Sequence, residues 1–129
     1  LWCCPVVPLR GADAALATSL CQRTMLAHGF EPMLALLAQH DRTAYLVPVL
    51  SYDRAIPGED ARALACHDAL LAALIADGYP PYRLGVQSMN ALPPPDDDSL
   101  ALYAALKAAL DPRDVLAPGR YDLRPSSAS

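Results

Sequence analysis

The alternation of apolar and polar stretches predicts a strand followed by a helix at the start of the chain. Residues 1–9, LWCCPVVPL, form a short apolar run that predicts a strand, although Pro5 and Pro8 favour an edge or bulged position. From Asp13 to His28 the apolar residues spread over a broad helical face, and Gly29 supplies a stop signal. The first helix is therefore expected over this range.

Two further apolar stretches predict a hairpin. They are EPMLALLAQ at residues 31–39 and TAYLVPVLSY at residues 43–52, and the polar residues His40–Arg42 separate them. Two apolar runs joined by a short polar segment are typical of paired strands with a tight turn.

A second helix and a fourth strand follow the hairpin. Ala61–Ala76 repeats leucines at helical spacing, has Glu59 and Asp60 near its start and ends before Gly78. The stretch YRLGVQSM at residues 82–89 predicts a strand, in which Gly85 indicates a bulge or a close approach by a ligand.

The order strand, helix, strand, strand, helix, strand predicts a fold class. It is the split βαβ order of ferredoxin-like α+β domains, an antiparallel sheet with both helices on one face. We assign residues 1–90 to this core. Residues 91–129 add a polar connector, a third helix and an irregular tail, within one domain overall. The acidic end of the connector, Asp96–Asp98, suits the N-terminus of this helix, Leu100 to Leu110 line one of its faces, and Asp111-Pro112 ends it.

Composition and charge exclude some function classes. Ten basic residues stand against fourteen acidic ones, without a basic cluster, so nucleic acid is not expected as a partner. No apolar run reaches the roughly 18 residues that cross a bilayer, so no membrane association is expected. The chain opens at Leu1 directly into an apparent strand, without a signal peptide pattern, and we expect a piece of a longer protein or a processed chain.

The cysteines and histidines do not predict a metal site. The four cysteines contain no CxxC pair and have no histidine at zinc-finger spacing, so we interpret them as small buried hydrophobic residues in a reducing, cytoplasmic compartment. The histidines lie far apart and are interpreted as structural: His28, His40 and His67.

Three motifs carry a resemblance to a known family. They are LWCCPVVP near the start, GYPPYRLGVQSM at residues 78–89, and ALKAALDPRDVLAPGRY near the end. Taken alone, Tyr82 fits a half-buried strand residue and Arg83 an ordinary surface cation. In order and spacing, however, the three motifs resemble the C-terminal substrate, or cap, domain of the flavin-linked vanillyl-alcohol oxidase and 4-cresol dehydrogenase family.

The resemblance implies a cofactor and site residues. FAD would be held mainly by a separate or missing FAD-binding domain or subunit, and an oligomer is expected. Tyr82 and Arg83 would hold the oxygen of a small phenolic substrate as phenolate, which helps a hydride leave toward the flavin. Gly119 and Arg120, in the PGR turn, would lie close to the flavin, where a cation stabilises the charge gained on reduction.

One departure from the family pattern leaves two functions open. Phenol-oxidising relatives carry an acidic residue in the second strand and a histidine in the third, where this chain has MLALLAQ and TAYLVPV. The first function is a cap domain or small subunit of an FAD-dependent oxidoreductase for phenolic or similar small aromatic substrates. The alternative is a catalytically degenerate ferredoxin-like module that binds a flavoprotein.

Overall fold

The computed structural model describes residues 1–118, which divide after Leu84 into two compact units. The second unit begins at Gly85 and contains a short 3-10 helix and one α-helix, η1 (Val86–Ser88) and α3 (Asp97–Leu110). The first unit contains the sheet and two α-helices: β1 (Val6–Pro8), α1 (Gly11–Ala27), β2 (Met33–Ala38), β3 (Thr43–Val49) and α2 (Glu59–Ala76). The predicted division into residues 1–90 and 91–129 stays a prediction.

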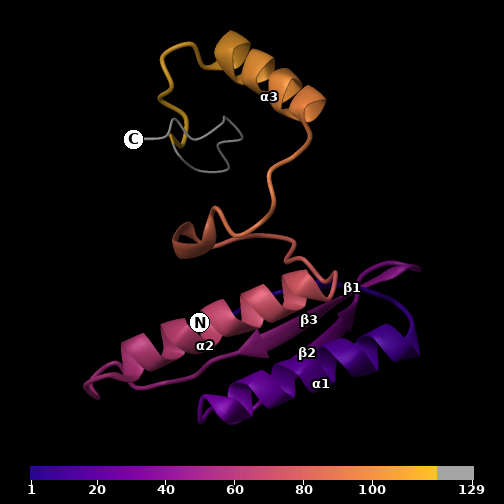
Figure 1. The fold of residues 1–129 in the computed structure, drawn as a ribbon, viewed down its shortest axis with the longest axis vertical. Helices are drawn as coiled ribbons and strands as arrows, with labels where there is room; N and C mark the ends of the chain where they lie inside the picture. Colours follow the sequence, from indigo (N-terminus) through magenta and orange to yellow (C-terminus); the bar gives the residue numbers. More distant parts are fainter. Residues whose placement is uncertain (119–129) are drawn as a thin grey trace. The chain divides into compact units, whose positions relative to one another are not determined.

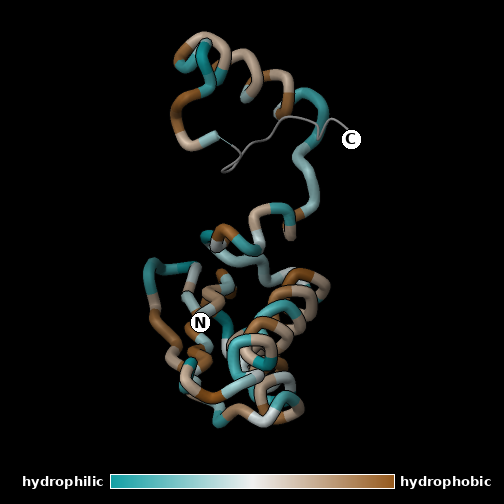
Figure 2. The backbone as a smooth tube through the Cα atoms, turned by 90° about the vertical axis from the view of Figure 1, so that its left-hand side faces the viewer, coloured by the Kyte–Doolittle hydropathy of each residue, from teal (hydrophilic) through white to brown (hydrophobic). Residues whose placement is uncertain are grey.

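The sheet has the strand order β1-β3-β2, with both pairings antiparallel (Figure 1). β2 and β3 form the predicted hairpin, in which Met33 lies opposite Val49 and Ala38 opposite Ala44. In Figure 2 this hairpin carries mostly hydrophobic residues on both sides of a hydrophilic turn. The predicted α+β fold with an antiparallel sheet is confirmed.

The predicted fourth strand at residues 82–89 is wrong. Only one isolated bridge forms beside β1, between Pro5 and Pro81, and the chain then bends and enters η1. The two prolines at 80 and 81 have no N–H group, so this segment can donate few ladder hydrogen bonds. Gly85 immediately precedes η1, and is not a bulge in a strand.

Both helices of the first unit cover the same face of the sheet (Figure 1). Val7 of β1 and Leu46 of β3 point toward the two helices. There their side chains join the buried residues of both helices in one hydrophobic core. The helical spacing of the apolar residues explains these faces. The buried helical residues are Ala17, Cys21 and Met25 of α1, and Ala63, Cys66, His67, Leu70, Leu71 and Leu74 of α2.

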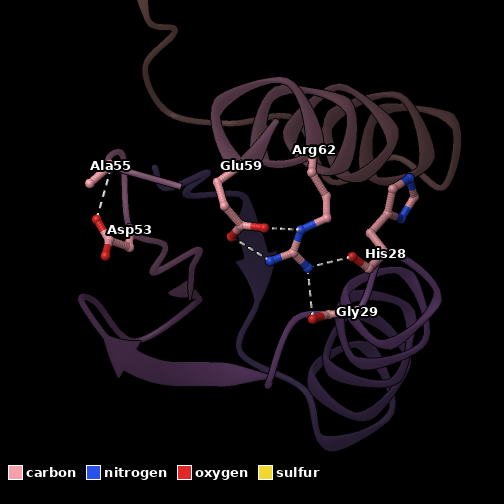
Figure 3. Close-up of polar contacts among 6 residues, drawn as sticks. All are labelled: His28, Gly29, Asp53, Ala55, Glu59 and Arg62. Carbon is pink, nitrogen blue, oxygen red and sulfur yellow. Dashed lines mark hydrogen bonds and ion pairs between the residues drawn. The ribbon is translucent and has the colours of Figure 1, made fainter. Parts of the chain in front are cut away.

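Arg62 of α2 forms hydrogen bonds with the C-terminal end of α1 (Figure 3). Its Nη1 donates to the carbonyl oxygens of His28 at 2.9 Å and Gly29 at 2.8 Å, while its other nitrogens donate to Glu59. The guanidinium carbon also lies 4.0 Å from the centre of the Phe30 ring. A helix leaves its last carbonyl groups without partners, and Arg62 supplies donors at this end of α1.

Candidate substrate-binding face

The side of the sheet turned away from the helices is apolar, and we call it the open face. Val6 lies opposite Tyr45 and Trp2 opposite Val49, so one register runs along the N-terminal segment. Successive residues of a strand point to opposite sides, and Cys3 and Val7 face the core. Pro8 and Thr43 lie at one end of this side, and we use the name open face for the nine positions beyond them: Trp2, Cys4, Val6, Met33, Ala35, Leu37, Tyr45, Val47 and Val49.

Tyr82 lies at one edge of the open face. Its backbone N–H donates to the carbonyl oxygen of Cys4 at 3.1 Å, next to the bridge at Pro81. Its ring stacks on the ring of Tyr45, with 4.9 Å between centroids and 19° between planes. Tyr82 remains 45% exposed, and the hydrogen bond at its hydroxyl group is exposed.

Arg83 turns back toward Tyr82 instead of pointing away from it. Its Nη2 donates a hydrogen bond to the Tyr82 hydroxyl oxygen at 3.2 Å, and its guanidinium carbon lies 5.3 Å from the Tyr82 ring centre. Neighbouring residues in a regular strand point to opposite faces, but the chain bends at these two residues. The structure thus brings Tyr82 and Arg83 together, while their catalytic role stays a prediction.

The guanidinium of Arg83 is paired with the Tyr82 hydroxyl group. Within residues 1–118, no Asp or Glu carboxylate forms an ion pair with its guanidinium. Burial raises the pKa of the Cys4 thiol, and the positive charge of Arg83 acts in the opposite direction. A cation with a spare hydrogen-bonding capacity at an apolar face is suited to hold an anionic oxygen.

Tyr45 was missed by the sequence analysis, which treated the stretch TAYLVPV as apolar. The strand register brings its phenol ring to the open face, where it contacts Tyr82. Period-two alternation shows that Tyr45 and Val47 share a face, but the sequence alone gives no sign of the contact with residue 82. None of the nine open-face positions is Asp, Glu or His.

The predicted flavin-side residues Gly119 and Arg120 lie outside the described residues. The loop that precedes them is organised by Asp111, whose buried carboxylate accepts hydrogen bonds from Lys107 Nζ at 2.5 Å and from the backbone N–H groups of Val115 and Leu116. The Lys107 bond and the backbone bonds lower the pKa of Asp111 to about 2. From the sequence, Asp111 was expected only to end the third helix.

The cysteines are buried, and His28 and His67 contact neighbouring groups of the chain. All four cysteines are buried and unpaired, as predicted. His28 Nδ1 is 2.9 Å from the Thr24 carbonyl oxygen, and His67 is buried on α2 beside Asp68. Across residues 1–118, no three His, Cys, Asp or Glu side chains gather where they could hold a metal ion. In the same part of the chain, no helix has the length and hydrophobicity to cross a bilayer.

Two curated proteins are similar to this chain over almost its whole length. The 1'-carboxy-chondrochloren decarboxylase of Chondromyces crocatus is 46% identical over 124 residues, which are 96% of this chain and 23% of that protein. The 4-cresol dehydrogenase [hydroxylating] flavoprotein subunit of Pseudomonas putida is 29% identical over 121 residues, 93% of this chain and 23% of that protein. The chain thus spans about a quarter of the length of these relatives.

The solved structures lead to the same family. The crystal structure of p-cresol methylhydroxylase with substrate bound matches with a TM-score of 0.83 and 28% sequence identity, over 96% of this chain and 24% of that chain. No family model matches the chain. By sequence and by fold, this chain belongs to the cap domains of the flavin-linked 4-cresol dehydrogenase family, as its three motifs predicted.

Proposed function

We propose that this chain is the substrate-binding cap domain of an FAD-dependent oxidoreductase, and that Tyr82 and Arg83 bind the oxygen of a phenolic substrate on the open face. The observation that carries the proposal is the hydrogen bond from Arg83 to the exposed Tyr82 hydroxyl, beside a surface of aromatic and aliphatic side chains. Contact with such a surface stabilises a bound aromatic ring, and the oxygen of the ligand needs a hydrogen-bond donor at the edge of that surface.

The hydrogen bond gives the two side chains different tasks. Because the Tyr82 oxygen accepts from Arg83, its own proton is free to be donated to a ligand oxygen. The guanidinium adds a fixed positive charge, which stabilises that oxygen as phenolate. Bound FAD would supply the acceptor for a hydride from the side-chain carbon that is attached to the ring para to this oxygen. A phenolate releases electrons toward that carbon better than a phenol does, and the organic product of hydride loss is a neutral quinone methide.

The flavin contacts of the chain stay a prediction, since Gly119 and Arg120 lie outside the described residues. An FAD-binding domain or subunit is the expected partner, and the exposed apolar side chains of the open face, among them Trp2 at 61% exposure, favour its docking there.

The test is to purify the chain alone and together with the flavin-binding polypeptide. We expect a stable complex that contains FAD and whose flavin spectrum changes with 4-methylphenol. A chain that is monodisperse, flavin-free and indifferent to that polypeptide contradicts the proposal.

A second candidate reaction is oxidative decarboxylation. The 46% identical relative is a decarboxylase, and the open face has no Asp, Glu or His that could take a proton from water. A quinone methide with a carboxylate on the next carbon can lose CO2 without a base. The C–C bond breaks, its electron pair forms a C=C bond, and the ring returns to phenolate.

The two outcomes give different products from one probe, 3-(4-hydroxyphenyl)propanoate. Decarboxylation after hydride loss gives 4-vinylphenol and CO2, whereas addition of water gives the 3-hydroxy acid. We expect 4-vinylphenol as the main product of the assembled flavoprotein. The hydroxy acid as main product favours the hydroxylating reaction, and no flavin reduction by any phenol favours the degenerate binding module.

A further inference from the structure

Tyr82 lies at the end of the short stretch that pairs with the N-terminal segment. Two backbone hydrogen bonds flank the isolated bridge between Pro5 and Pro81: Val6 N–H donates to the Pro80 carbonyl oxygen at 2.9 Å, and Tyr82 N–H donates to the Cys4 carbonyl oxygen at 3.1 Å. The chain bends directly afterwards. Tyr82 is nearly half exposed. Backbone hydrogen bonds hold the main chain of Tyr82, but they do not by themselves fix the direction of its ring.

Tyr45, in contrast, stands in the most firmly paired part of the sheet. It belongs to the central strand β3 and lies opposite Val6 on one side and Leu37 on the other. Its neighbours in the strand, Ala44 and Leu46, are buried in the helix-covered layer. The backbone position of Tyr45 is therefore set by two ladders and by the core.

The ring of Tyr45 is the only aromatic ring that the structure places against Tyr82 among the described residues. The centroid distance of 4.9 Å and the angle of 19° fall in the range of favourable stacked pairs. Arg83 bonds to the hydroxyl group of the stacked ring, so the position of that hydroxyl also sets the position of the guanidinium.

We propose that Tyr45 is a positioning residue: its ring is the platform that fixes the Tyr82 ring and thereby directs the Tyr82 hydroxyl and Arg83 toward the ligand. This inference rests on the proposed function of Tyr82 and Arg83. The contribution of Tyr45 comes from its ring and not from its hydroxyl group, which separates it from a residue that touches the ligand oxygen.

The first experiment needs no ligand. Tyrosine rings of the chain are labelled with ¹³C, and the Tyr82 signals are assigned with Tyr82→Phe. Tyr45→Leu, or Tyr45→Val if the leucine variant does not fold, should shift the Tyr82 ring signals, while Tyr45→Phe should leave them near their original positions. Tyr103→Leu is the control, because Tyr103 has the same 45% exposure as Tyr82 but lies on α3. Unchanged Tyr82 signals in folded Tyr45→Leu or Tyr45→Val overturn the proposal.

The second experiment titrates the same variants with 4-methylphenol. Tyr45→Leu should weaken binding by about 2- to 12-fold, the loss expected for one aromatic pair, and Tyr45→Phe should bind like the original chain. If Tyr45→Phe loses as much affinity as Tyr45→Leu, the hydroxyl group acts on the ligand and the positioning role is wrong. If Tyr82→Phe binds 4-methylphenol normally, the proposed function fails. The shift of the Tyr82 ring signals in Tyr45→Leu still tests separately whether Tyr45 positions the Tyr82 ring.

Discussion

A substitution at Gly29 tests the contact by which Arg62 of α2 binds the end of α1. Gly29 and Gly78 follow α1 and α2, with φ angles of +73° and +82°. In this left-handed region an alanine costs about 1 to 2 kcal/mol. At Gly78 a Cβ atom would meet nothing within 4 Å, but at Gly29 it would lie 3.1 Å from Arg62 Nη1. That nitrogen donates to the Gly29 carbonyl, so it cannot withdraw without loss.

We therefore expect Gly78→Ala to lower the Tm by about 4 to 16 °C, and Gly29→Ala to lower it further. Thermal and urea unfolding followed by circular dichroism measure both changes. Gly11→Ala is the control, because its Cβ would meet nothing within 4 Å and Gly11 has no positive φ, so no loss is expected. Adding Arg62→Met should remove the difference between the two variants. If Gly29→Ala is no worse than Gly78→Ala, the Arg62 contact is not formed as described.

Three further predictions concern other parts of the chain. The pKa of Asp111 is lowered to about 2, below its unfolded value near 4, so its contribution to stability is present above pH 4 and is lost as the pH falls toward 2; in Asp111→Asn, urea unfolding should show a smaller pH dependence in that window. Burial raises the pKa of the Cys3 and Cys21 thiols to about 12, and at Cys3 the neighbouring cysteines Cys21 and Cys4 add to the effect. Iodoacetamide at pH 8 should therefore modify neither thiol in the folded chain, and rapid modification contradicts their burial. In the assembled flavoprotein, Arg120→Leu should lower the flavin potential and slow flavin reduction by every substrate alike, and unchanged potentials and rates remove Arg120 from the site.

Much of the fold could be predicted from periodicity. α1 at Gly11–Ala27 and α2 at Glu59–Ala76 lie within two residues of the ranges expected from their apolar spacing and their glycine stops. The hairpin followed from two apolar runs and a polar turn. Helix α3 begins at Asp97, within the acidic stretch expected at its N-terminus, and Asp96 caps it by accepting from the Ser99 N–H.

The candidate site was predicted less completely, because its geometry depends on contacts between distant residues. The motif YPPYR indicated Tyr82 and Arg83, yet the same prolines that made it recognisable also prevent the expected fourth strand. The stack on Tyr45 depends on strand register, which a single sequence does not reveal. The loop contacts of Asp111 need Lys107 one helical turn earlier, and helical spacing of the two residues could have indicated them.

The most direct test of the proposed function compares Tyr82→Phe and Arg83→Met in the assembled flavoprotein, with Arg23→Met as a control for loss of a surface arginine. Stopped-flow flavin reduction is measured with 4-methylphenol and with a matched substrate that lacks the para hydroxyl group. We expect Tyr82→Phe to weaken phenol binding by about 0.5 to 3 kcal/mol. Arg83→Met should slow reduction by the phenol by about 10² to 10³, the usual loss of one oxyanion donor, while the matched substrate is scarcely affected. Normal phenol binding and reduction in both variants would show that Tyr82 and Arg83 are only structural residues.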